Sequence, residues 1–248
     1  MAITKRLDVL LVEKNFFPTR SRARDAIMRK TIQVDGKIIF KAGQMISEEA
    51  EIMVDDPAQH YVSRAALKLI GALDVFPVVT SQVTAIDIGA STGGFTQVLL
   101  ERGAAHVIAV DVGHHQFDVR LLNNNNAITL LEGLNIRNLK KEHLNGHEID
   151  LIVSDVSFIS LKLALPSALS LAKKGAQAVL LVKPQFEAGR KDIGKRGILK
   201  DPLVAQKTAE ELFTWLNLQE GWVAKGLLPS PITGSDGNIE YLLFGEKQ

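Results

Sequence analysis

The chain has 248 residues, of which 46% are hydrophobic, so it can form one large domain with a smaller companion. Lysine and arginine (29) nearly balance aspartate and glutamate (28), which excludes a chain that is polycationic throughout. The absence of cysteine excludes disulfides, thiolate metal sites and cysteine nucleophiles. No stretch approaches the roughly 18 apolar residues of a membrane span, and no signal peptide is recognisable, so we expect a cytoplasmic protein.

Positive charge is concentrated near the N-terminus, where residues 1–41 contain ten basic and four acidic side chains. Apolar spacing predicts a helix over 6–12 and a second, arginine-rich helix over 21–29, which Thr19 or Ser21 would cap. Residues 32–39 are predicted to form two strands joined by an Asp-Gly turn. A basic helix beside a tight hairpin is suited to contact an RNA backbone, although a solvated helix face would have the same pattern.

Three segments of this region, Lys5-Arg6-Leu7-Asp8, 20–27 and Val34-Asp35-Gly36-Lys37, together resemble the S4 RNA-binding domain. The resemblance implies an α+β unit over residues 1–54 that binds structured RNA. A polar linker with one proline is expected at 55–60. The basic residues that we expect to contact RNA are Lys5, Arg6, Arg20, Arg22, Arg24, Lys37 and Arg64.

After a predicted helix at 61–76, strand-like and helix-like segments alternate. Strands are predicted at 83–88, 106–111, 127–131, 149–154, 176–183, 222–228 and 239–244, and helices near 94–102, 115–122, 160–173 and 201–219. This alternation predicts an α/β fold for residues 61–248, with a seven-stranded Rossmann-like sheet covered on both faces. Because only a short turn region joins the last two strands, we expect them to form an antiparallel pair.

A glycine-rich turn follows the first of these strands. Glycines allow a sharp turn and a close approach of the backbone to a ligand, and the next helix begins at that point. No lysine follows Gly94, so the turn is not a phosphate-binding P-loop, and it fits the first motif of methyltransferases better than a dinucleotide motif. A turn without any ligand is the alternative.

Asp111 ends the next strand about 20 residues later, where a carboxylate typically binds ribose hydroxyls. We therefore expect S-adenosyl-L-methionine to be the ligand. The residues predicted to bind it are Asp87, Gly89, Ala90, Ser91, Gly93, Gly94, Phe95, Asp111 and Asp155.

Charged residues also stand at the ends of other predicted strands. Asp155 follows 149–154, Lys183 emerges from the apolar run 178–182, and Glu240 lies within the last predicted strand. Functional side chains collect at the carboxyl ends of strands in open α/β sheets. A charge at such a position therefore either faces a cleft or costs several kcal/mol when it is buried and unpaired.

Two features that the chain lacks, a cysteine and a double-proline motif, narrow the choice of methyl acceptor. Methylation at C5 of a pyrimidine normally needs a cysteine nucleophile. Enzymes that methylate exocyclic amines usually carry two prolines where this chain has Asp155-Val156-Ser157-Phe158. An oxygen acceptor remains, and a lysine with a lowered pKa could accept the proton of a ribose hydroxyl or stabilise the developing alkoxide.

This arrangement resembles the FtsJ-type ribose methyltransferases, whose Lys-Asp-Lys-Glu tetrad corresponds to Lys68, Asp155, Lys183 and Glu240. With the S4-like unit in front, the chain resembles the TlyA family, whose members are often labelled hemolysins. The resemblance implies 2′-O-methylation of cytidine in ribosomal RNA or a ribosomal subunit, with Lys183 closest to the chemistry and Asp155 beside donor and acceptor. Lys68 and Glu240 would orient the ribose, and a plain salt bridge is the alternative for that pair.

The chain departs from that family at Val112-Gly113-His114-His115-Gln116, where Val-Gly-Tyr-Gly-Gln is common, and it stops at Gln248, where some members continue with a helix. The two histidines have no third ligand in view, so no metal site is predicted. No obligate protein partner is evident. The basic segment 186–200 would be a lid, an RNA contact or a solvated loop. Two other functions compete: a membrane-active hemolysin, and an RNA-binding assembly factor with a vestigial methyl-donor site.

Overall fold

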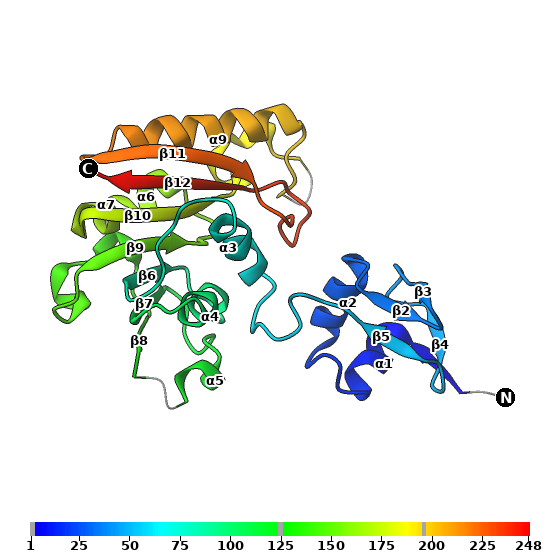
Figure 1. Cartoon of the computed structure of the whole chain (residues 1–248). Helices are drawn as coiled ribbons and strands as arrows, with labels where there is room; N and C mark the ends of the chain where they lie inside the picture. Colours follow the sequence, from blue (N-terminus) through cyan, green and yellow to red (C-terminus); the bar gives the residue numbers. More distant parts are fainter. Residues whose placement is uncertain (1–2, 124–125, 195–196) are drawn as a thin grey trace. The chain divides into compact units, whose positions relative to one another are not determined.

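The computed structural model describes residues 3–123, 126–194 and 197–248. The chain divides into two compact units, Met1–His60 and Tyr61–Gln248 (Figure 1). Residues 55–60, where a linker is expected from the sequence, pack with the first unit. There Arg29 forms an ion pair with the buried carboxylate of Asp56 (Nη2–Oδ2 2.8 Å).

The first unit contains two short helices and two small antiparallel sheets. Its elements are β1 (Thr4–Arg6), α1 (Leu7–Glu13), α2 (Arg20–Met28), β2 (Ile32–Val34), β3 (Lys37–Ile38), β4 (Met45–Ser47) and β5 (Ile52–Val54). β1 pairs with β4, and the other sheet has the order β3-β2-β5. The predicted cap is confirmed, since the hydroxyl of Thr19 accepts from the backbone N–H of Arg22. The Asp35-Gly36 turn is confirmed as well, with φ of 49° and 73° as a tight hairpin requires.

The second unit is built on the seven-stranded sheet (Figure 1), in the order β11-β12-β10-β9-β6-β7-β8. Its elements are α3 (Ala66–Leu73), β6 (Thr84–Ile88), α4 (Gly94–Glu101), β7 (His106–Asp111), α5 (Val119–Leu122), β8 (Ile128–Glu132), the 3-10 turns η1 (Ile136–Asn138) and η2 (Lys141–Leu144), β9 (Ile149–Ser154), α6 (Leu161–Ala164), α7 (Pro166–Leu171), β10 (Ala172–Val182), α8 (Pro184–Glu187), η3 (Arg190–Asp192), α9 (Pro202–Asn217), β11 (Trp222–Pro229) and β12 (Tyr241–Lys247). The predicted antiparallel pairing of the last two strands is confirmed, and β12 also runs antiparallel to β10.

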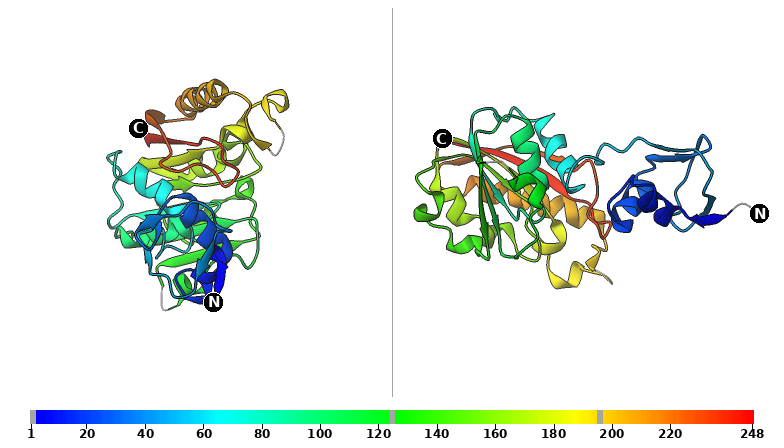
Figure 2. Two further views of the ribbon diagram at one scale, coloured as in Figure 1. Left: turned by 90° about the vertical axis from the view of Figure 1, so that its right-hand side faces the viewer. Right: turned by 90° about the horizontal axis from the view of Figure 1, so that it is seen from below.

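Helices cover both faces of this sheet (Figure 2). Side chains alternate along each strand, so that Leu180 of β10 points to the core under α6, α7 and α9, whereas Val179 points to the core under α3 and α4. Both cores are continuous along the central strands. The carboxyl ends of β6, β7, β9 and β10 are therefore held rigidly along one edge. Within the described ranges, no helix combines the length and apolar character that a membrane span needs.

Several predicted helices are shorter in the structure. The helix expected at 61–76 is limited to α3, since the backbone N–H of Val62 donates to the side chain of Gln97 instead of joining a helix. The helix expected at 115–122 begins only at Val119, because Asp118 caps it and His115 has a positive φ of 57°.

Two further predictions near the end of the sheet are wrong in detail. The helix expected at 160–173 is broken into α6 and α7 at Pro166, and β10 already begins at Ala172, with an irregular register before Gln177. Glu240 does not lie within the last strand, which begins at Tyr241, but immediately precedes it.

Candidate active site

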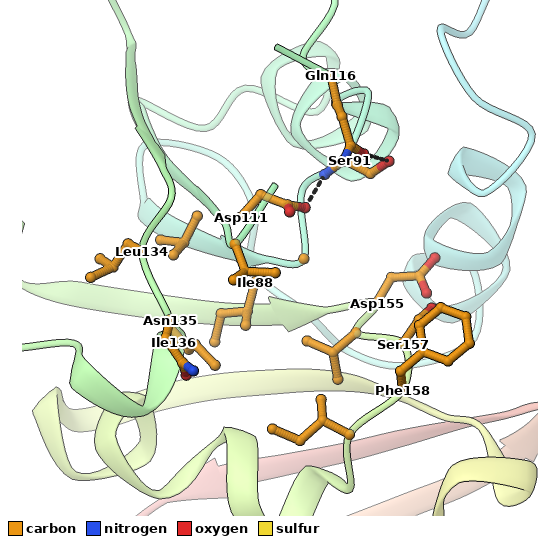
Figure 3. A pocket seen from close by; sticks show the side chains of 15 residues that line it. Ile88, Ser91, Asp111, Gln116, Leu134, Asn135, Ile136, Asp155, Ser157 and Phe158 are labelled. Carbon is orange, nitrogen blue, oxygen red and sulfur yellow. Dashed lines mark hydrogen bonds between the residues drawn. The ribbon is translucent and has the colours of Figure 1, made fainter. Parts of the chain in front are cut away.

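A cavity of about 460 Å³ opens at the carboxyl ends of β6, β7 and β9 (Figure 3). Asp111 lies in its wall, and its carboxylate accepts hydrogen bonds from the backbone N–H groups of Ser91 and Gly113, both at 2.7 Å. Leu134 and Ile136 form an apolar wall that Figure 3 shows on the side away from Asp155. The cavity is of the size and mixed polarity typical of small-molecule sites, which are about 300–1,000 Å³.

The predicted glycine turn borders this cavity, and its backbone geometry explains two of the glycines. Gly89 has a φ of 82°, and a Cβ there would lie 2.8 Å from the carbonyl oxygen of Asp155. Gly93 has a φ of 92° at the N-cap of α4, and a Cβ would lie 2.6 Å from the side chain of Leu121. No other residue suits either position, because a side chain would be strained and would also clash.

Asp87 lies fully buried at the end of β6, beside a smaller cavity of about 180 Å³ that Lys183 also lines. Its Oδ2 accepts a hydrogen bond from the hydroxyl of Thr96 (2.7 Å), whereas its Oδ1 has no partner among the described residues. Burial raises the pKa of Asp87 to about 7, against the opposing effect of the Thr96 hydroxyl. A buried carboxylate oxygen without a partner is suited to bind a cationic group of a ligand.

The four residues of the predicted tetrad come together at this edge of the sheet. The Nζ of Lys183 lies 2.5 Å from Oδ1 of Asp155, and the Nζ of Lys68 lies 2.6 Å from Oε2 of Glu240. The two pairs are adjacent, since Lys68 Nζ is also 3.9 Å from Oδ2 of Asp155. Burial raises the pKa of Glu240, and the charge of Lys68 opposes that rise.

A third cavity, of about 540 Å³, is also lined by Lys183, together with Gln185, Asp236 and Glu240 among others. Ser157 lines all three cavities, and its hydroxyl accepts a hydrogen bond from Nζ of Lys183 (2.7 Å). Sequence reasoning does not identify Ser157 as a site residue. Its position two residues after Asp155, in a segment that follows a strand end, is the available signal.

Two aromatic residues and one acid define the segment beside these cavities, and sequence reasoning misses them too. Phe158 is 90% exposed with a positive φ of 64°, and its ring centroid lies 5.0 Å from that of Phe186. Glu187 of α8 connects this helix to the start of α6, because its carboxylate accepts hydrogen bonds from the hydroxyl of Ser160 (2.5 Å) and from the backbone N–H of Leu161 (2.6 Å). Burial raises the pKa of Glu187.

Part of the basic segment 186–200 lies against this site, although Lys195 and Arg196 fall outside the described residues. The buried amide of Asn238 accepts from the N–H of Leu199 (2.9 Å) and donates to the carbonyl of Gly197 (3.0 Å). The described portion is thus hydrogen-bonded to the turn that precedes Glu240. The rings of His114 and His115 lie 6.2 Å apart, and no group of three metal-binding side chains occurs within the described ranges.

The residues predicted to contact RNA have different surroundings. Arg6, Arg20 and Arg24 gather around the carboxylate of Asp8. The other four predicted residues do not join that group. Lys5 forms ion pairs with Glu13 (2.7 Å) and Glu48 (2.8 Å), and Arg22 donates to the carbonyl of Ala58 (2.7 Å). Lys37 is exposed on β3, and Arg64, which belongs to the second unit, donates to the carbonyl of Thr233 (3.4 Å).

Two family profiles match the chain: the S4 domain over residues 5–52 and the FtsJ-like methyltransferase over residues 61–247. The 16S/23S rRNA (cytidine-2′-O)-methyltransferase TlyA of Mycobacterium tuberculosis is 39% identical over 252 residues, covering 98% of this chain and 90% of its own. Hemolysin A of Brachyspira hyodysenteriae is 37% identical, over 96% of this chain and 98% of its own.

Two solved structures are also similar to this chain. A hemolysin-labelled protein from Streptococcus thermophilus has a TM-score of 0.76 and 38% identity, covering 100% of this chain and 90% of its own. An S-adenosylmethionine-dependent methyltransferase from Listeria monocytogenes has a TM-score of 0.56 at 15% identity, covering 75% of this chain and 100% of its own. The second likeness shows the fold of the larger unit alone.

Proposed function

Since this chain belongs to the FtsJ-like methyltransferases, and among them to the TlyA family whose members also carry an S4 domain, we propose that it methylates ribosomal RNA. The methyl group would pass from S-adenosyl-L-methionine to the 2′-oxygen of a ribose, and the acceptor nucleotide would be a cytidine, as the names of two relatives state for those proteins. The S4 unit would hold the RNA. A ribosomal substrate implies a cytoplasmic enzyme.

The cavity of about 460 Å³, which we call the donor cavity, fits S-adenosyl-L-methionine by its size and by the chemistry of its walls. Asp111 would accept hydrogen bonds from the ribose hydroxyls, and Leu134 and Ile136 would contact the adenine. The unpartnered Oδ1 of Asp87 would bind the ammonium of the methionine portion. When bound, this cofactor supplies a methyl group on a sulfonium, which an oxygen nucleophile can attack.

The single observation that carries the proposal is that Lys183 lines two cavities. It lines the small cavity beside the glycine turn and also the cavity of about 540 Å³, which we assign to the methyl acceptor, so one amino group would border donor and acceptor together. As the neutral amine, Nζ of Lys183 would accept the proton of the ribose hydroxyl. The ammonium formed in this step, paired with Asp155, would stabilise the oxygen as its negative charge develops. Ser157 would hold Lys183 in this position.

Lys68 and Glu240 form the second layer of the site. The carboxylate of Glu240 lines the acceptor cavity, and its ion pair with Lys68 sets the position of both side chains. We propose that they orient the ribose rather than take its proton, because Lys68 lines none of the three cavities that meet at Ser157.

The proposal is tested by transfer of radiolabelled methyl groups from S-adenosyl-L-methionine to unmodified 16S and 23S rRNA transcripts and ribosomal subunits. We expect label in alkali-resistant dinucleotides, because a 2′-O-methyl group blocks alkaline cleavage. Lys183→Ala should lower transfer at least about 100-fold, as expected when a proton-transfer group is removed. Lys174→Ala is the matched control, since Lys174 is exposed near the start of β10, the strand that Lys183 follows. Label on a base atom, or full activity of Lys183→Ala, would contradict the proposal.

A further inference from the structure

Asp8 is a buried acid in the most basic part of the chain. It lies in the first turn of α1, and its side chain has 0% exposure. Oδ1 accepts from Nε of Arg6 (3.0 Å), while Oδ2 accepts from Nη2 of Arg6 (3.2 Å), Nε and Nη2 of Arg20 (3.3 and 3.0 Å) and Nε of Arg24 (2.8 Å). One carboxylate thus binds three guanidinium groups, from the N-cap of α1 and from the first two turns of α2.

The three arginines remain accessible although they share one partner. Their side chains are 46%, 49% and 49% exposed for Arg6, Arg20 and Arg24. Each guanidinium has five N–H donors, and within the described residues the hydrogen bonds to Asp8 use only the Nε and Nη2 groups. The Nη1 groups are left for a ligand. Asp8 itself offers no oxygen to solvent, because its side chain has 0% exposure.

We propose that Asp8 is the positioning residue of a preformed phosphate-binding site in which Arg6, Arg20 and Arg24 bind the RNA backbone. This inference rests on the proposed function only in taking RNA as the ligand. A planar guanidinium binds phosphate through two parallel N–H donors, so its orientation matters as well as its charge. Without a shared anion, three like charges at this spacing would repel one another and separate.

The neighbouring basic residues lack this combination of charge and access. Lys5 lies between two carboxylates, and Arg29, whose side chain is only 15% exposed, is paired with Asp56. The group around Asp8 instead carries three positive charges and one negative charge, so it keeps a net charge of +2 on half-exposed side chains. It is therefore suited to attract and orient phosphates.

Two opposite expectations separate positioning from simple charge attraction. If only net charge mattered, Asp8→Asn would tighten RNA binding, because it removes a negative charge from a basic surface. If Asp8 positions the arginines, Asp8→Asn weakens binding, since an amide places N–H donors against the guanidinium groups. Glu49→Gln is the matched control, because it removes one negative charge from an exposed site in the turn between β4 and β5.

The experiment measures binding of a 23S rRNA transcript to the full-length chain at several salt concentrations. We expect Asp8→Asn to weaken binding at least fivefold and Glu49→Gln to leave it unchanged or tighter. The dependence of log Kd on log salt should become shallower in Asp8→Asn, by about 0.7–0.9 for each phosphate that the variant no longer neutralises. In methyl transfer, KM for RNA should rise while kcat at saturating RNA stays within twofold. A folded Asp8→Asn that binds as tightly as the unaltered chain, or more tightly, overturns the proposal.

A second variant covers the case in which Asp8→Asn does not fold, which circular dichroism and thermal unfolding detect. Arg24→Lys keeps the positive charge but removes the guanidinium whose Nε donates to Oδ2 of Asp8 (2.8 Å), while Asp8 stays intact. Weaker RNA binding by Arg24→Lys supports the proposal, and unchanged binding overturns it. The outcome is distinct from the test of the enzyme: if the unaltered chain transfers no methyl group to RNA, the proposed function fails, but Asp8-dependent binding would still stand.

Discussion

The Lys68–Glu240 pair provides a quantitative test of whether these residues act in the reaction or only join the domain. The Nζ–Oε2 distance is 2.6 Å, and the two side chains are 7% and 2% exposed. We consider the single variants Lys68→Met and Glu240→Gln and the double variant that combines them. Each single change leaves one charge buried without its partner, whereas the double change removes both charges.

Breaking a buried ion pair by removing one partner typically costs about 3–5 kcal/mol of unfolding free energy. Glu240→Gln should cost about 3 kcal/mol, the lower end, because Lys68 still has Asp155 at 3.9 Å. Lys68→Met should cost a similar amount near pH 8. Its cost should shrink toward pH 5, because burial raises the pKa of Glu240 and a protonated carboxyl no longer needs a cation. The double variant should be destabilised by only about 1 kcal/mol.

Urea unfolding gives the three free energies, and methyl transfer to rRNA gives the activities. We expect stability to recover in the double variant while activity stays at least about tenfold low, since neither charge remains to orient the ribose. Lys225→Met is the control, because Lys225 pairs with Glu246 at 3.9 Å with side chains 42% and 33% exposed. Its cost should stay below about 1 kcal/mol.

Two results would refute this reasoning. Additive destabilisation in the double variant would mean that the two side chains are not energetically coupled, despite the 2.6 Å distance between them. Recovery of activity together with stability would mean that the pair is a plain salt bridge and that the ribose is oriented by other groups.

Two more variants test the surroundings of the site. The folded chain binds a proton at Asp87 more tightly than the unfolded chain does, because burial raises the pKa of Asp87 to about 7. The free energy of unfolding should therefore fall by about 4 kcal/mol as the pH rises from about 4 to 7. Urea unfolding of Asp87→Asn should not show this decrease, and an equal decrease in the variant would refute the assignment to Asp87. Ser157→Ala removes the acceptor of the Lys183 hydrogen bond (2.7 Å), so kcat should fall about tenfold. The affinity for S-adenosylhomocysteine, measured by calorimetry, should stay within threefold of that of the unaltered chain. An unchanged kcat would contradict this role of Ser157.

Local patterns predict most of the larger unit. The strand, glycine turn and helix around Gly89 are signalled by neighbouring residues, so their order can be read directly from the sequence. The alternation of apolar runs with helical segments likewise predicts all seven strands, with errors of a few residues at their ends. The short strands β1, β4 and β5 escape prediction because three residues carry too little periodicity to recognise, and no turn like the Asp35-Gly36 turn between β2 and β3 marks them.

Contacts between distant residues cannot be predicted in the same way. In the sequence, Asp8 is only one negative charge among basic residues, whereas in the fold it gathers arginines from positions 2, 12 and 16 residues away. The position of Ser157 after Asp155 does not reveal its role, because its hydroxyl gains that role only when Lys183, 26 residues away in the chain, is placed beside it. Both assignments depend on tertiary packing, which no periodicity records.

The antiparallel strand β12 explains why Glu240 reaches the site at all. In a wholly parallel sheet, only residues that follow a strand lie at the carboxyl edge. Because β12 runs the opposite way between β10 and β11, the residue that precedes it reaches that edge, and Tyr241 pairs directly with Val182. Glu240 and Lys183 are the next residues outward from this pair. A glutamate within the strand, as the sequence suggests, would lie on a face of the sheet, away from the lysine that it accompanies.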